Sequence, residues 1–196
     1  MTDFTERSQG GRQPAIHRQF HAQLATLDAR LKRVRLFLCD VDGVLTDGTV
    51  LVGEGIEAKS FSIQDGMGLA LLRRAGIKVG WISNRASTAT ATRAAELKVD
   101  FLYQDKTSKV AAIESILQQT GAGWDEVCYV GDDLVDLGAL RRAGVAVAVA
   151  NAVVEAKAIA HLVTAATGGH GAVREVVELI LRAQERWEEM LAVFAD

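Results

Sequence analysis

The chain has 196 residues, of which 49% are hydrophobic, and it carries a formal net charge of −3 at pH 7 and a single proline. This length suits one domain that can bury a substantial core, and the composition excludes a wholly disordered chain. The small net charge does not favour binding to nucleic acid or to an anionic membrane surface.

The first segment, residues 1–33, differs in charge from the rest, because it holds six Lys/Arg residues and three Asp/Glu residues. We interpret it as an N-terminal extension, helical or partly disordered, that precedes a single domain over residues 34–196. It lacks the apolar core of a signal peptide, and no stretch approaches the roughly 18–20 apolar residues of a membrane span. We therefore expect a cytoplasmic protein.

From residue 34 onward, short apolar runs alternate with turns and with segments of helical period, as in stacked βα units. This alternation predicts an α/β fold, a Rossmann-like doubly wound parallel sheet with helices on both faces. The predicted strands are 34–39, 77–82, 99–103, 126–130 and 145–149, and the predicted helices are 66–75, 87–97, 108–120 and 134–143. Cys39 and Cys128 fall within two of these apolar runs and are expected as free, buried thiols.

Two further segments complete the predicted elements. Residues 49–52 and 58–63 flank Gly53-Glu54-Gly55, which predicts a β-hairpin that projects as a small flap. Apolar residues at helical spacing over 172–192 predict one long amphipathic helix at the end of the chain.

The first predicted strand ends in two carboxylates, Asp40 and Asp42, followed by Gly43. In such a pair, one carboxylate can attack phosphorus while the other transfers a proton. An EF-hand calcium loop is excluded, because its twelfth position needs a glutamate and here holds Leu51. An ordinary acidic turn remains an alternative on these residues alone.

Polar groups also follow the next three strands. Ser83, Asn84 and Arg85 after the second strand can form a phosphate cradle at a helix start or, alternatively, a simple N-cap. A lysine before the next helix, such as Lys109, can neutralise charge on a transferring phosphoryl group or lie on the surface. The fourth strand leads into a cluster of carboxylates that suits Mg²⁺, and its members are Asp132, Asp133 and Asp136.

This series of motifs resembles the haloacid dehalogenase superfamily of aspartate-nucleophile phosphatases over residues 34–180. The matching signatures, in chain order, are Asp40-Val-Asp42-Gly43, Ser83, Lys109, and Gly131-Asp132-Asp133 with Asp136. The resemblance implies that Asp40 forms an aspartyl-phosphate and that Asp42 acts as acid and base. It also implies that Ser83 and Lys109 hold the phosphoryl group. The implied Mg²⁺ site consists of Asp40, the backbone carbonyl of Asp42, Asp132 and, in support, Asp133.

The intervals between these signatures leave no room for a cap domain. Within the capless members, the chain resembles the 3-deoxy-D-manno-octulosonate 8-phosphate phosphatase family of lipopolysaccharide biosynthesis, through 39–48, 65–68, 102–104, 129–134 and 168–175. That resemblance implies a homotetramer in which hairpin flaps help to close neighbouring sites. The residues that it places around the sugar acid are Ser62, Ile63, Gln64, Asp65, Gly66, Arg85, Arg93 and Lys109.

Several positions depart from that family's usual pattern. His170 stands where an arginine is usual, Ala70 and Gln64 stand where one is frequent, and Ser83-Asn84 replaces a common Thr-Gly. Because arginines bind carboxylates in a bidentate way, an alternative substrate is a nine-carbon, sialic-acid-type 9-phosphate. An alternative of another class is a non-catalytic assembly partner. A cysteine phosphatase and a P-loop kinase are excluded, because neither the Cys-x5-Arg pattern nor the Gly-x4-Gly-Lys-Ser/Thr pattern occurs.

Overall fold

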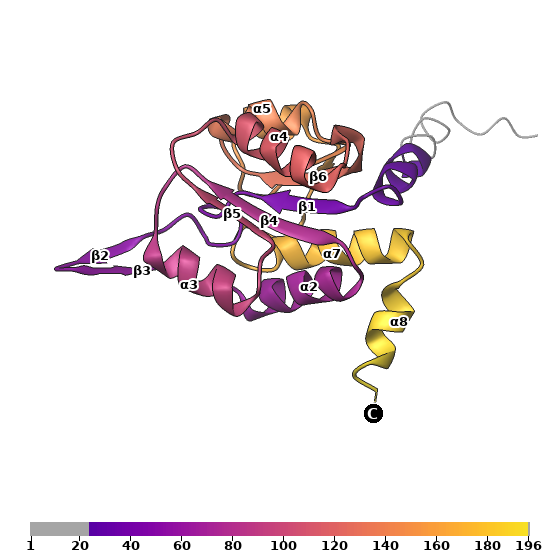
Figure 1. The fold of residues 1–196 in the computed structure, drawn as a ribbon, viewed down its shortest axis with the longest axis horizontal. Coiled ribbons are helices and arrows are strands. Elements are labelled where there is room, and N and C mark those ends of the chain that lie inside the picture. Colours follow the sequence, from indigo (N-terminus) through magenta and orange to yellow (C-terminus); the bar gives the residue numbers. More distant parts are fainter. Residues whose placement is uncertain (1–23, 196) are drawn as a thin grey trace, which may run out of the picture.

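The structure is a computed structural model that describes residues 24–195. In this part of the chain, the main sheet has six strands in the order β5-β4-β1-β6-β7-β8, and each neighbouring pair is parallel (Figure 1). The strands are β1 (Leu36–Cys39), β4 (Lys78–Ser83), β5 (Phe101–Gln104), β6 (Val127–Gly131), β7 (Val145–Ala148) and β8 (Leu162–Val163). The predicted parallel sheet is confirmed.

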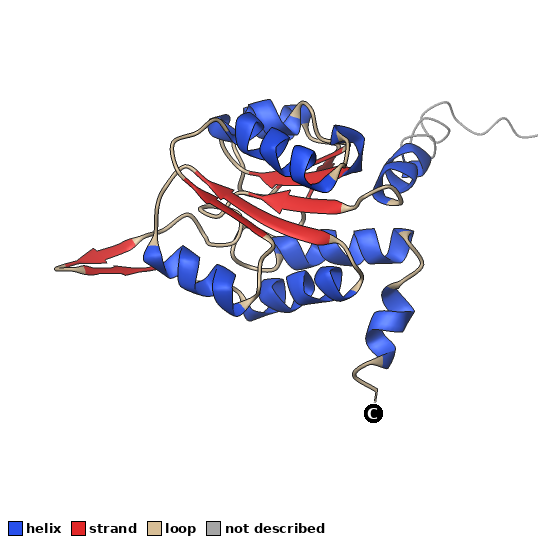
Figure 2. Ribbon diagram, in the orientation of Figure 1, coloured by secondary structure: helices blue, strands red, loops and turns tan. Residues whose placement is uncertain are grey.

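Helices cover both faces of this sheet, as Figure 2 shows. In Figure 1, α2, α3 and α7 lie on one face and α4 and α5 on the other. The helices are α2 (Ile63–Arg74), α3 (Thr88–Glu96), α4 (Lys109–Thr120), α5 (Leu137–Leu140), α6 (Val154–Ile159), α7 (Ala172–Ala183) and α8 (Trp187–Ala192), with 3₁₀ turns at Trp124–Glu126 and Leu134–Asp136. The predicted doubly wound α/β fold is therefore confirmed.

The central strand β1 consists of buried apolar residues because both of its faces are covered by helices. It pairs with β4 on one side and β6 on the other, so the chain passes outward to β5 and then returns across β1. In open α/β sheets, ligands bind beyond the carboxyl ends of the strands where the direction of progression reverses. The end of β1 lies at such a point.

The predicted hairpin is present but shorter than expected, with β2 (Leu51–Gly53) antiparallel to β3 (Ile56–Ala58). It projects away from the main sheet in Figure 1. Its return segment ends at Ser62, whose hydroxyl accepts a hydrogen bond from the backbone N–H of Asp65 and thereby caps α2. The helix consequently starts three residues before the predicted position.

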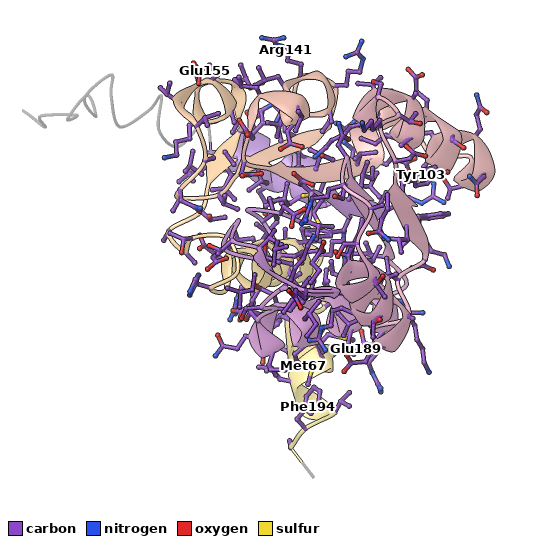
Figure 3. The ribbon with its side chains drawn as sticks, turned by 90° about the vertical axis from the view of Figure 1, so that its left-hand side faces the viewer. Met67, Tyr103, Arg141, Glu155, Glu189 and Phe194 are labelled. Atoms are coloured by element: carbon purple, nitrogen blue, oxygen red, sulfur yellow. The ribbon has the colours of Figure 1, made fainter. Side chains whose placement is uncertain are left out.

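The prediction of one long helix over 172–192 is wrong. Helix α7 ends at Ala183, and Glu185 adopts a left-handed conformation with φ of 58° before α8 begins. The side-chain amide of Gln184 donates to the carbonyls of Leu31 and Val34, so contacts with a distant segment stabilise the break. Phe194, beyond α8, lies exposed at the lower end of the molecule in Figure 3.

Other predicted elements differ in detail. The predicted helix 134–143 divides into a 3₁₀ turn and the short α5, while α6 and β8 were not predicted. Cys39 and Cys128 are free and buried, as expected. Within residues 24–195, no helix combines the length and the apolar character that a membrane crossing requires.

The described part of the predicted N-terminal extension is helical over residues 24–31. Its last residue, Leu31, is buried, and the guanidinium of Arg30 donates to the carbonyl of Gly144 at 2.7 Å. This helix therefore packs on the domain. The part of the extension before residue 24 lies outside the described residues.

Candidate active site

A cavity of about 230 Å³ lies at the carboxyl ends of the central strands. Its lining brings together most of the residues that the sequence motifs single out: Asp40, Asp42, Ser83, Asn84, Arg85, Lys109, Asp132 and Asp133, with Val135. Among the described residues, the predicted sugar-acid contacts from Ser62 to Gly66 and Arg93 do not line it.

Asp40 follows β1 directly and is almost completely buried. Its Oδ1 accepts a hydrogen bond from the backbone N–H of Val41 at 2.7 Å, and its Oδ2 lies 2.9 Å from Nζ of Lys109. Burial raises the pKa of the Asp40 carboxyl to about 6, although Lys109 counteracts the rise. The carboxylate is therefore mostly ionised at neutral pH and available as a nucleophile.

Lys109, the first residue of α4, lies between two carboxylates. Its Nζ is 2.9 Å from Asp40 and 2.6 Å from Asp136, and its side chain is buried. Burial acts to lower the pKa of Lys109, but Asp40 and Asp136 outweigh that effect and raise it above its usual value. The lysine therefore stays charged, and the alternative of a surface lysine is wrong.

Asp136 is fully buried, does not line the cavity, and supports this arrangement through hydrogen bonds. Its Oδ1 accepts hydrogen bonds from Lys109 Nζ and the Tyr129 hydroxyl, and its Oδ2 accepts them from the backbone N–H groups of Asp132 and Asp133. Because each oxygen of the fully buried Asp136 already accepts two hydrogen bonds, whereas each oxygen of Asp40 has one partner, we interpret Asp136 as a holder of Lys109 and of the Asp132 turn, and not as a metal ligand. The sequence placed it in the acidic cluster but did not reveal this role.

Asp132 has the environment expected of a cation ligand. Its Oδ1 is buried and has no hydrogen-bond partner among the described residues. Burial, followed by the negative charges of Asp40 and Asp136, raises the pKa of Asp132 to about 7. Carboxylate oxygens of Asp40, Asp132 and Asp136 lie within 4.8 Å of one another. With Asp136 engaged in its own hydrogen bonds, the oxygens of Asp40 and Asp132 are the members of this group that suit a hard divalent cation such as Mg²⁺.

Asp42 has its own lysine. Its Oδ1 lies 2.7 Å from Nζ of Lys59, whose side chain is fully buried. The same Nζ donates to Oγ1 of Thr90 on α3 at 3.1 Å. Lys59 was missed by sequence reasoning, because a lysine after a short strand gives no signal of burial.

Ser83 ends β4 and forms a tight turn with Arg85. Its hydroxyl donates to the Arg85 carbonyl and accepts from the Arg85 N–H, each at 3.1 Å. The N-cap of α3 is Ser87, so the N-cap alternative for Ser83 is wrong. Arg85 also forms an ion pair of 2.9 Å with Glu57 on β3, which joins the hairpin to the wall of the cavity.

Two other predicted contact residues have partners within the fold. The buried carboxylate of Asp65 accepts hydrogen bonds from the backbone N–H groups of Gly171 and Arg174 at 3.2 and 2.7 Å. Arg93 pairs with Glu96 at 2.8 Å. Asp65 thus fastens the glycine-rich turn before α7 to the start of α2.

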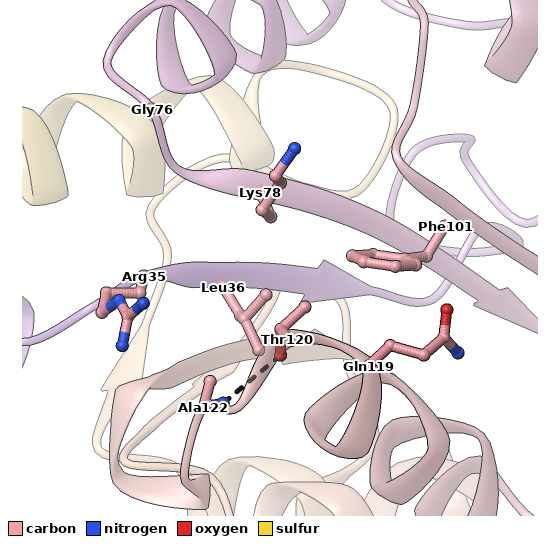
Figure 4. A pocket seen from close by; sticks show the side chains of 8 residues that line it. All are labelled: Arg35, Leu36, Gly76, Lys78, Phe101, Gln119, Thr120 and Ala122. Atoms are coloured by element: carbon pink, nitrogen blue, oxygen red, sulfur yellow. Dashed lines mark hydrogen bonds between the residues drawn. The ribbon is translucent and has the colours of Figure 1, made fainter.

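A second hollow, of about 400 Å³, lies at the amino ends of the strands (Figure 4). It is larger than the first, but its cations are already paired, Arg35 with Glu126 at 3.0 Å and Lys78 with Asp100 at 2.8 Å. Both cationic side chains are more than half exposed. The chemistry-bearing, buried charges are therefore at the carboxyl ends.

Comparisons with known proteins find similar sequences and structures. The haloacid dehalogenase-like hydrolase family model matches residues 81–176. The chain is 40% identical over 160 residues to the 3-deoxy-D-manno-octulosonate 8-phosphate phosphatase KdsC of Yersinia pestis, which covers 81% of this chain and 86% of that protein.

Two solved structures are also similar. One is a haloacid dehalogenase superfamily (subfamily III A) hydrolase from Legionella pneumophila, with a TM-score of 0.87 and 37% identity, covering 90% of this chain and 97% of that one. The other is the 3-deoxy-D-manno-octulosonate 8-phosphate phosphatase of Moraxella catarrhalis in complex with a magnesium ion, a phosphate ion and KDO. It has a TM-score of 0.84 and 38% identity, covering 86% of this chain and 97% of that one.

Proposed function

The chain belongs to the 3-deoxy-D-manno-octulosonate 8-phosphate phosphatase family of haloacid dehalogenase-like hydrolases, and from this we propose that it is a magnesium-dependent phosphatase acting on that sugar-acid phosphate. The products are the free sugar acid and inorganic phosphate, and the reaction is a step of lipopolysaccharide biosynthesis. The observation that carries the proposal is the buried Asp40–Lys109–Asp136 arrangement beside Asp132 in one cavity.

In the first half of the proposed reaction, the Asp40 carboxylate attacks phosphorus and the bond from phosphorus to the sugar oxygen breaks. Asp42 gives its proton to the leaving oxygen. Lys109 holds Asp40 in place and neutralises negative charge on the phosphoryl group, because its Nζ is already 2.9 Å from Asp40. Ser83 binds the phosphoryl oxygens from the end of the neighbouring strand.

In the second half, Asp42 takes a proton from water while the water oxygen attacks phosphorus. The bond between phosphorus and the Asp40 oxygen breaks, which releases phosphate, restores the Asp40 carboxylate and leaves Asp42 protonated for the next cycle. One residue thus serves as acid and then as base, so its position relative to the reacting oxygen matters in both halves.

The residues present fit magnesium. We propose that Asp40, Asp132 and the backbone carbonyl of Asp42 hold the ion and that Asp133 supports it, since Asp132 has a buried oxygen without a partner. When bound, magnesium supplies charge neutralisation for the phosphoryl oxygens and the carboxylates. The side chain of Asp133 caps the 3₁₀ turn by accepting from the N–H of Leu134 at 2.7 Å, and this bond orients the Asp132 turn.

Several further expectations belong to this proposal. We propose a cytoplasmic homotetramer in which the hairpin helps to close a neighbouring site, with one domain over residues 34–196. The projecting hairpin supports this, because its apolar residues Leu51, Val52 and Ile56 are 67–77% exposed. Arg85, Arg93, Lys109 and the segment from Ser62 through Ile63, Gln64 and Asp65 to Gly66 are the proposed sugar-acid contacts. Sedimentation should give a tetramer, and a fully active monomer would contradict the shared site.

The two alternatives are not favoured. Two of the similar proteins are named as phosphatases of the eight-carbon phosphate. A non-catalytic partner would have no use for clustered, buried carboxylates with raised pKa values, since these destabilise a metal-free fold.

The proposal is tested by phosphate release with Mg²⁺ from eight-carbon and nine-carbon keto-acid phosphates, hexose phosphates and p-nitrophenyl phosphate. We expect the highest kcat/KM with the eight-carbon acid and a reversible loss on chelation. A preference for a nine-carbon acid would make His170 and Ala70 determinants of specificity, and activity with none of the substrates would overturn the assignment.

A further inference from the structure

Lys59 is a buried cation in an otherwise exposed part of the chain. It follows β3 directly, and the hairpin residues Leu51, Val52 and Ile56 beyond it are largely exposed. Its own side chain is 0% exposed. Burial of an unpaired ammonium costs several kcal/mol, so such a lysine is retained only with partners of good geometry.

Its partners lie on two other segments of the chain. Nζ lies 2.7 Å from Oδ1 of Asp42, which follows β1, and it donates to Oγ1 of the buried Thr90 on α3 at 3.1 Å. A second contact from the same side of the hairpin, the 2.9 Å ion pair of Glu57 with Arg85, reaches the Ser83 turn. The return strand of the hairpin is therefore fastened to the cavity at two points.

The contact divides the Asp42 carboxylate into two parts. Oδ1 is buried, and its contact with Lys59 is an ion pair and not a hydrogen bond, whereas the side chain as a whole is 24% exposed and lines the cavity. Oδ2 is therefore the oxygen that can reach a substrate. Each of the two cavity carboxylates thus has its own lysine, Lys109 for Asp40 and Lys59 for Asp42.

We propose that Lys59 is a positioning residue that holds Asp42 by Oδ1 so that Oδ2 meets the leaving oxygen of the substrate. This inference rests on the proposed function, because it concerns the proton that Asp42 gives to that oxygen. Lys59 neither gains nor loses a proton in the step. It also makes the orientation of Asp42 depend on how the hairpin root is seated.

The inference predicts a loss that depends on the leaving group. A sugar alcohol is a poor leaving group and needs the proton, whereas p-nitrophenolate leaves without it. In a Lys59→Met variant, which keeps the length of the side chain without its charge, we expect kcat/KM for the sugar-acid phosphate to fall roughly 100-fold. We expect kcat/KM for p-nitrophenyl phosphate to fall less than about 5-fold. The value of kcat/KM reports only the steps through the departure of the leaving group, and p-nitrophenolate departs without the proton from Asp42.

Three variants control for stability and for the loss of any lysine. Lys78→Met removes a 57% exposed lysine at the other end of the sheet and should leave kcat/KM unchanged for both substrates. Thr90→Val removes only the second partner of Lys59. It should lower kcat/KM for the sugar-acid phosphate less than Lys59→Met does, and should again lower it more than kcat/KM for p-nitrophenyl phosphate. Lys59→Arg keeps the positive charge, so its kcat/KM for the sugar-acid phosphate should be higher than that of Lys59→Met. Thermal unfolding of each variant shows whether it is folded at the assay temperature.

The outcomes separate the two proposals. Wild-type protein that releases no phosphate from the sugar-acid phosphate overturns the proposed function and this inference with it. If the wild type is active, equal losses on both substrates, or no loss, in Lys59→Met overturn the positioning role alone. If Lys59→Met does not fold, the same comparison of kcat/KM for the two substrates is made with Thr90→Val and Lys59→Arg. Equal losses on both substrates, or no loss, in these variants then overturn the positioning role.

Discussion

Two hollows lie at opposite ends of one sheet, and the larger is not the one that gathers unusual charges. At the amino ends, Arg35 and Lys78 are more than half exposed and each is paired with an acid. At the carboxyl ends, Lys109 and Asp40 are buried and Asp132 keeps an oxygen without a partner. Cavity size alone is thus a weaker indicator of function than charges whose burial the fold does not fully compensate.

The carboxylates at the two ends also differ in the direction of their pKa shifts. For Asp100, burial acts to raise the pKa, but the ammonium of Lys78 and the N–H of Val79 outweigh it and lower the value. For Asp132, burial and neighbouring acids raise the pKa to about 7. Asp100 therefore stabilises the fold when ionised, whereas Asp132 destabilises it until a cation is present.

The largest expected contrast is between the two lysines that face the hollows. Lys109→Met should lower kcat by roughly 10³-fold, because it removes the charge beside the reacting phosphoryl group. It should also destabilise the fold by about 3–5 kcal/mol, since it leaves Asp40 and Asp136 buried without a cation. Lys78→Met should leave kcat unchanged and cost about 0–1 kcal/mol. Steady-state assays and urea unfolding measure both, and equal effects would remove the distinction between the two ends.

Magnesium removal gives the second contrast. Asp132→Asn should lower kcat by roughly 100-fold at fixed Mg²⁺ and abolish the rise in Tm on adding Mg²⁺, because it removes the proposed ligand. The same variant should make the metal-free protein more stable, by about 1–3 kcal/mol at pH 8, since a costly buried charge is lost. Asp100→Asn should keep the response to Mg²⁺ and lower stability. An Mg²⁺ response retained in Asp132→Asn would contradict the assignment.

Two glycines with positive φ provide a matched pair for the third test. Gly43 has φ of +95°, and an added Cβ would lie 2.0 Å from Oδ2 of Asp132, whereas Gly76, with φ of +76°, has nothing within 4 Å. Alanine at either site should cost about 1–2 kcal/mol from backbone strain. We expect only Gly43→Ala also to weaken Mg²⁺ binding, by roughly 10-fold, because Asp132 must move. Equal Mg²⁺ affinities in the two variants would contradict this packing.

The smallest expected effect is on pH dependence. Because Asp40 and Asp132 have raised pKa values in the folded protein, the folded state binds more protons than the unfolded state, and metal-free stability falls as pH rises from about 4 to about 7. Bound Mg²⁺ should relieve this loss, so the rise in Tm on adding Mg²⁺ should be larger at pH 8 than at pH 5, by a few degrees. Calorimetry measures the metal-free stability and the rise in Tm on adding Mg²⁺. A rise in Tm that does not depend on pH would contradict the raised pKa values of Asp40 and Asp132.

How far the sequence predicted this site depends on where the partners of each residue lie. Asp40 and Asp132 follow a strand and Ser83 ends one, and parallel strands bring their carboxyl ends to one edge, so their meeting was predictable. Lys59 was not, because its burial arises from contacts with segments after β1 and on α3. The break after α7 was missed for the same reason, since Gln184 contacts carbonyls at residues 31 and 34, about 150 positions earlier.

The central claim is that Asp40 at the end of β1 carries the phosphoryl group, and a rapid acid quench of turnover with ³²P-labelled sugar-acid phosphate tests it most directly. We predict that the label appears, within the first turnover, on the peptide that contains Asp40, and that Asp40→Asn carries none. Steady turnover without labelled protein, or label on a peptide from elsewhere in the chain, would contradict the account.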